Sequence, residues 1–81
     1  MAYKLLIVED EKEKATGIAY LTGKYNPECR PVLLAHDGRE GYEKATAEQP
    51  DIIVTDIRMP EMDGLEMIRE LKKAGCSAEF I

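Results

Sequence analysis

Three acidic residues stand where short apolar segments end. Glu9 and Asp10 directly follow the apolar residues 5–8, and Asp56 directly follows the β-branched segment Ile52–Thr55. Carboxylate oxygens are preferred ligands of hard cations such as Mg²⁺. A carboxylate is also ionised at neutral pH and can act as an oxygen nucleophile. Both kinds of chemistry require the three acids to meet in space, which depends on the elements that carry them.

Strand-like and helix-like patterns alternate along the chain. We predict strands at Tyr3–Val8, 32–35 and Ile52–Thr55, helices at 12–24, Gly38–Glu48 and 65–74, and the beginning of a fourth strand at 77–81. Strict alternation of this kind predicts an α/β fold in which a doubly wound parallel sheet carries helices on its faces.

The carboxyl ends of parallel strands meet at one edge of such a sheet, and that edge is where ligands bind. With the first strand between the second and the third, Glu9, Asp10 and Asp56 become neighbours. Three adjacent carboxylates repel one another unless a cation lies among them. The sequence therefore predicts a Mg²⁺ site at this edge.

Composition restricts the classes of protein to consider. The 81 residues suffice for one small domain, and the formal charge of -5, without a visible basic cluster, argues against direct nucleic-acid contact. The apolar residues 5–8 are too few for a signal-peptide core or a membrane span, so we expect a cytoplasmic protein without membrane contact. Cys29 and Cys76 lie far apart without a CxxC motif, which favours reduced, structural cysteines.

Three segments together resemble the receiver domain of two-component response regulators. They are LLIVEDE at residues 5–11, AHDGREGYEKA at 35–45 and VTDIRMPEMDG at 54–64. Their order and spacing match the receiver pattern over the whole chain. The resemblance implies a flavodoxin-like sheet with strand order 2-1-3-4-5. It also implies that residues 1–81 are a receiver domain incomplete at the C-terminus, ending after three βα units and the start of a fourth strand.

The resemblance also implies a function. A sensor histidine kinase would donate a phosphoryl group to Asp56, with Mg²⁺ held by Asp10, Asp56 and the backbone carbonyl of Arg58, and with Glu9 contributing through water. The domain would then switch an output domain in the parent chain, most commonly one that regulates transcription. In this reading the protein is a phosphoacceptor switch and not an enzyme.

The segment after Asp56 has to bring a backbone carbonyl back to the metal. Pro60 and Gly64 predict a rigid turn followed by an unhindered backbone. Asp63, just before the third helix, is expected to be its N-cap and not a metal ligand. His36, the only histidine, is expected to lie outside the acidic cluster.

Receivers carry two further groups at the site, a hydroxyl residue after the fourth strand and a lysine after the fifth. The resemblance places neither within residues 1–81, so we expect this chain to bind Mg²⁺ weakly and to be phosphorylated poorly or not at all. We also expect one face of the first strand and the surroundings of the third to be uncovered, which favours a homodimer or a swapped oligomer. The alternative function is accordingly a truncated or degenerate receiver that acts only as a self-associating interaction module.

Other interpretations of the same residues stay open. Asp10 could cap the first helix, Glu9 could be a solvated surface residue, and Asp56 could simply end a strand. A phosphohydrolase of the haloacid dehalogenase type also phosphorylates an aspartate at a strand end. Its pattern has a second acid two residues later, where this chain has Arg58.

Overall fold

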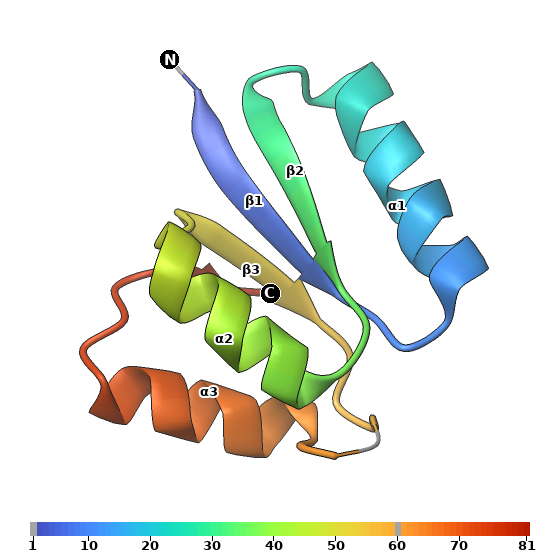
Figure 1. The fold of residues 1–81 in the computed structure, drawn as a ribbon. Helices are drawn as coiled ribbons and strands as arrows, with labels where there is room; N and C mark the ends of the chain where they lie inside the picture. The colour runs from blue at the N-terminus through green and yellow to red at the C-terminus, as the bar shows by residue number, and fades with distance from the viewer. Residues whose placement is uncertain (1, 60) are drawn as a thin grey trace.

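The computed structural model of the protein describes residues 2–59 and 61–81. Its elements are β1 (Tyr3–Val8), α1 (Lys12–Tyr25), β2 (Cys29–Ala35), α2 (Gly38–Glu48), β3 (Ile52–Thr55), α3 (Gly64–Lys73) and β4 (Glu79–Phe80). The strands are parallel and lie in the order β2-β1-β3-β4. Helix α1 lies on one side of the sheet, and α2 and α3 lie on the other (Figure 1). The predicted doubly wound α/β sheet is confirmed.

Strand β2 begins at Cys29, earlier than the predicted start at residue 32. The added residues include Pro31, which cannot donate a ladder hydrogen bond. However, β2 is an edge strand, where a proline is tolerated because one side of the strand faces solvent. The register with β1 shifts between Tyr3 and Leu5, which accommodates the irregular segment. The predicted start was too late because the continuous apolar pattern begins only at Val32, after Pro31.

The side chains of β1 are buried on both faces of the sheet. Leu6 and Val8 belong to the main core, while Leu5 and Ile7 point to the opposite face because side chains alternate along a strand. Helix α1 packs on β1 and β2 and buries Ala15. The expectation of an uncovered face on the first strand is therefore wrong, because α1 and the flanking strands already cover it.

The main core lies between the sheet and the α2 and α3 layer. It comprises Leu6, Val8, Ala35, Ala45, Ile53, Met67 and Leu71. Among residues 2–59 and 61–81, none of the helices combines the length and the apolarity that crossing a membrane requires.

Two helices begin at side-chain caps. The carboxylate of Asp37 accepts a hydrogen bond from the Glu40 N–H (2.7 Å), and that of Asp63 accepts one from the Glu66 N–H (2.8 Å). The predicted N-cap role of Asp63 is thus confirmed. Pro60, which we predicted to stiffen the preceding turn, lies outside the described residues.

Gly41 marks the closest approach of α2 to the core. A Cβ atom added there would lie 2.7 Å from Met67 Sδ and 2.9 Å from Val8 Cγ2. Gly17, in α1, has no atom within 4 Å of the same added position. The two helical glycines therefore differ only in whether a methyl group has room.

Alanine at these positions should change stability in opposite directions. We expect Gly41→Ala to lower the free energy of unfolding by about 1–3 kcal/mol through overpacking. We expect Gly17→Ala to raise it by about 0.5–1 kcal/mol, because alanine is the better helix former and nothing obstructs it. Urea unfolding followed by circular dichroism measures both variants, and equal effects would contradict the tight contact at Gly41.

Candidate functional site

The site forms at the carboxyl edge of the sheet, where β1 lies between β2 and β3. Val8 is paired with Ala35 on one side and Thr55 on the other. Just beyond this pairing, the Glu9 N–H donates to the Ala35 carbonyl (2.9 Å), and the Asp56 N–H donates to the Val8 carbonyl (3.1 Å). These bonds fix the backbones that follow β1 and β3 beside each other.

The three predicted acids meet at this edge. Glu9, Asp10 and Asp56 each place one carboxylate oxygen within 4.8 Å of the others. Glu9 is only 3% exposed and is the one buried charged residue in the described part of the chain. Asp56 is half-buried and Asp10 is exposed. The cluster is thus open to solvent on the side of Asp10 and closed behind Glu9.

Two of the acids are held by local contacts. Glu9 Oε2 accepts a hydrogen bond from the Glu11 N–H (3.2 Å), and Glu9 Oε1 lies 3.7 Å from Lys14 Nζ. Asp56 Oδ1 accepts a hydrogen bond from the Ile57 N–H (2.7 Å). Helix α1 has Glu11 as its N-cap without a side-chain cap bond, so Asp10 does not cap it. The Asp10 carboxylate therefore remains available for another role.

The segment after Asp56 turns back tightly onto the end of β3. The Gly64 N–H donates to the Ile57 carbonyl (2.7 Å), and a Cβ atom on Gly64 would lie 2.1 Å from the Asp56 carbonyl oxygen. Only glycine fits this contact. The Arg58 carbonyl accepts no backbone hydrogen bond within residues 2–59 and 61–81. Its predicted role as a metal ligand stays a prediction.

The donor set of the cluster fits Mg²⁺. All three donors are carboxylate oxygens, the type of ligand that this ion prefers. With Mg–O distances of about 2.1 Å, opposite ligands of one ion are about 4.2 Å apart. The three carboxylate oxygens lie within 4.8 Å of one another, a separation at which they could share one ion.

His36 lies outside the acidic cluster, as predicted. Its backbone N–H donates to Glu40 Oε1 (2.7 Å), and its Nδ1 lies 3.3 Å from the same oxygen. The hydrogen bond from the His36 backbone, helped by Lys44, lowers the pKa of Glu40 below its ordinary value, although partial burial opposes the change. This interaction joins the end of β2 to the first turn of α2.

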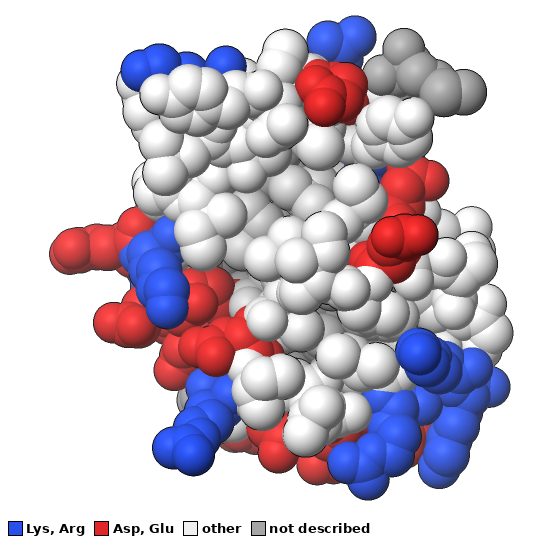
Figure 2. Space-filling view, turned by 180° about the vertical axis from the view of Figure 1, so that it is seen from behind, with Lys and Arg blue, Asp and Glu red and all other residues white. Residues whose placement is uncertain are grey.

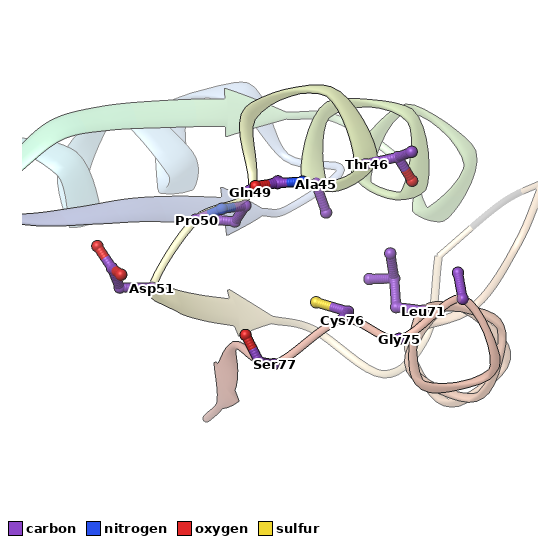
Figure 3. A pocket seen from close by; sticks show the side chains of 10 residues that line it. Ala45, Thr46, Gln49, Pro50, Asp51, Leu71, Gly75, Cys76 and Ser77 are labelled. Atoms are coloured by element: carbon purple, nitrogen blue, oxygen red, sulfur yellow. The ribbon is translucent and has the colours of Figure 1, made fainter.

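One cavity lies away from the acidic cluster. It has a volume of about 550 Å³ and lies between the C-terminal ends of α2 and α3 and the beginning of β3 (Figure 3). Its lining consists of Ala45, Thr46, Gln49, Pro50, Asp51, Leu71, Ala74, Gly75, Cys76 and Ser77. Asp51 and Asp56 flank opposite ends of β3, so the cavity and the cluster are separate features.

Comparisons with known proteins agree with the observed fold. A family model described as the response regulator receiver domain matches residues 5–81. The chain belongs to the receiver domain family. Similar solved structures include the N-terminal domain of a Wolinella succinogenes protein (37% identity, TM-score 0.88, 98% of this chain and 61% of that one). A receiver domain protein from Clostridium thermocellum is also similar (28% identity, TM-score 0.85, 99% and 62%).

Curated relatives are much longer than this receiver. The transcriptional regulatory protein YesN of Bacillus subtilis is 37% identical over 79 residues, which are 98% of this chain and 22% of YesN. The alkaline phosphatase synthesis transcriptional regulatory protein PhoP of the same species is 36% identical over 73 residues (90% and 29%). The hybrid signal transduction histidine kinase D of Dictyostelium discoideum is 47% identical over 68 residues (84% and 4%).

Lys14 is a residue of the site that we did not predict from the sequence. It is the only Lys, Arg or His that forms an ion pair with the acidic cluster within the described residues. The signal in the sequence is weak, because Lys12 and Lys24 lie on the same helix. Lys14 differs from these two lysines because its position around the axis of α1 brings it close to the buried Glu9.

Mg²⁺ binding should depend on the individual acids and not on the overall negative charge. We expect Asp10→Asn and Asp56→Asn each to raise the Kd for Mg²⁺ by roughly tenfold or more, because each removes a charged donor. Asp51→Asn makes the same change of charge at the other end of β3 and keeps an acceptor for the Lys4 N–H. Isothermal titration calorimetry measures all three; an equal loss in Asp51→Asn would exclude a localised site.

Proposed function

We propose that this receiver domain accepts a phosphoryl group on Asp56 from a sensor histidine kinase, with residues 1–81 acting as one receiver unit. The observation that supports this most is the convergence of Glu9, Asp10 and Asp56 within 4.8 Å at the carboxyl edge of the sheet. The family assignment supports the same chemistry. In this proposal the domain is a phosphoacceptor switch and not an enzyme with its own turnover.

The transfer is a substitution at phosphorus. An oxygen of Asp56 attacks the phosphorus of a phosphohistidine, the O–P bond forms, the P–N bond breaks, and the departing imidazole nitrogen takes up a proton. The product is an acyl phosphate. Because the Ile57 N–H occupies Asp56 Oδ1, we assign the nucleophilic role to Oδ2.

The remaining site residues would hold the metal. We assign Asp10, Asp56 and the Arg58 carbonyl as direct Mg²⁺ ligands, and Glu9 as a ligand through water. When bound, Mg²⁺ supplies positive charge to the phosphoryl oxygens. Glu9 suits the indirect role because its Oε2 already accepts a hydrogen bond from the Glu11 N–H.

The names of two relatives support a proposal about the output of the parent protein. YesN and PhoP are named as transcriptional regulatory proteins, and this chain spans 22% and 29% of their lengths. We propose that the parent protein carries an output domain that controls transcription in the cytoplasm. The receiver itself, with a formal charge of -5, would make no direct contact with nucleic acid.

The acyl phosphate can be tested directly. Incubation with acetyl phosphate and Mg²⁺ should add one phosphoryl group, detected by intact-protein mass spectrometry and removed by hydroxylamine. The adduct should be absent in Asp56→Asn and present in Asp51→Asn. Equal adducts in wild type and Asp56→Asn would exclude Asp56 as the acceptor.

Exposed apolar residues favour a second function, self-association. Tyr20, Leu21 and Tyr25 of α1 are exposed. Figure 2, which views the molecule from behind, shows a broad area without Lys, Arg, Asp or Glu side chains. Soluble monomers rarely expose large apolar patches. Strand β4 has only two residues and leaves a free sheet edge, so a homodimer or a swapped oligomer would cover both features.

Two leucines with matched exposure test this second function. Leu21 in α1 is 53% exposed and Leu65 in α3 is 54% exposed, and their helices lie on opposite sides of the sheet. We expect Leu21→Lys to shift the chain toward the monomer in sedimentation equilibrium, because it places a charge among the exposed apolar side chains of α1. Leu65→Lys should leave the association unchanged. A monomeric wild type at micromolar concentration would refute the self-association.

A further inference from the structure

Lys14 carries a positive charge at a position where that charge does not stabilise its own helix. Lys14 lies in the first turn of α1, where the partial positive charge of the helix end repels cations. Its ammonium nevertheless lies 3.7 Å from Glu9 Oε1. The position is therefore better explained by the acidic cluster than by the helix.

Glu9 needs a positive partner as long as the site holds no metal ion. It is 3% exposed, and a buried carboxylate is costly unless it is paired or hydrogen-bonded. Its partners in the described residues are the Glu11 N–H and Lys14. Lys14 itself is 56% exposed on its side chain, so it can move away from Glu9 into solvent at little cost.

We propose that Lys14 is a built-in counter-ion that competes with the divalent cation for Glu9 and so sets the metal affinity of the site. This inference depends on the Mg²⁺ site of the proposed function. With the metal absent, Lys14 partly neutralises the three carboxylates. When the metal binds, the ammonium is repelled by the new charge and leaves Glu9. Lys14 is thus a positioning residue, because it acts on the metal through Glu9.

The test compares two lysines of the same helix turn. Lys12 also lies in the first turn of α1, but it forms no ion pair within the described residues. Calorimetric titration of the 81-residue chain with MgCl₂ in about 0.15 M salt, which screens distant charges, gives the Kd of each variant. We expect Lys14→Gln to lower the Kd by roughly threefold to tenfold. Lys12→Gln should change it by less than about twofold, and Lys14→Arg should retain the wild-type Kd.

Removal of Glu9 supplies the second readout. In a Glu9→Gln background, Lys14→Gln should have no larger effect than Lys12→Gln, because the shared partner is gone. The increase in Tm caused by Mg²⁺ should likewise be larger in Lys14→Gln than in wild type.

Three outcomes would overturn the inference. If Lys14→Gln and Lys12→Gln change the Kd equally, or if Lys14→Gln weakens binding, Lys14 does not compete for Glu9, and the phosphoacceptor proposal still stands. If neither the wild type nor any variant binds Mg²⁺, both the metal site and the role of Lys14 fail together.

Discussion

The site depends on the register with which β2 and β3 pair with β1 around Val8. Val8 faces Ala35 and Thr55, and the next hydrogen bonds along the chain hold Glu9 and Asp56 side by side. A shift of β3 by one residue would turn its side chains to the other face of the sheet and move Asp56 away from the acids of β1. The burial of Leu6, Val8 and Ile53 in one core opposes such a shift, so the core determines where the site forms.

Several features of the site reduce stability locally, and the surrounding packing compensates for them. Clustered carboxylates repel one another, and Glu9 is buried as well. The contact of Gly64 with Asp56 and that of Gly38 with the Met62 carbonyl leave no room for a side chain. Gly38 brings α2 against Met62 in the loop that follows β3. The same loop therefore has two close backbone contacts, one at Gly38 and one at Gly64. The chain thus preorganises the acids with backbone contacts, which do not depend on the presence of a metal ion.

The sequence predicted most of the fold and the acidic cluster, because both follow from short-range patterns. Apolar segments that end in Glu9 and Asp56 indicate strands and their carboxyl ends, and parallel topology then brings the acids together. The start of β2 at Cys29 and the burial of Leu5 and Ile7 were not predicted. The first depends on the pairing of Cys29 with Tyr3 of β1, and the second depends on how far α1 reaches over β1, and both are tertiary properties. We missed Lys14 for the same reason, because its contact with Glu9 depends on the rotation of α1 about its own axis.

The two sides of the sheet differ in packing, and this difference bears on both proposed functions. The α2 and α3 side holds the main core, whereas α1 buries only Ala15 and exposes Leu21 and Tyr25. An element with few buried contacts opens at a lower free energy than the core does. The first turn of α1 also carries Lys14, so displacement of this side chain from Glu9 acts on the least anchored helix of the chain. Metal binding at the acidic cluster and covering of the α1 surface would therefore be coupled through α1, because both change the contacts of the same helix.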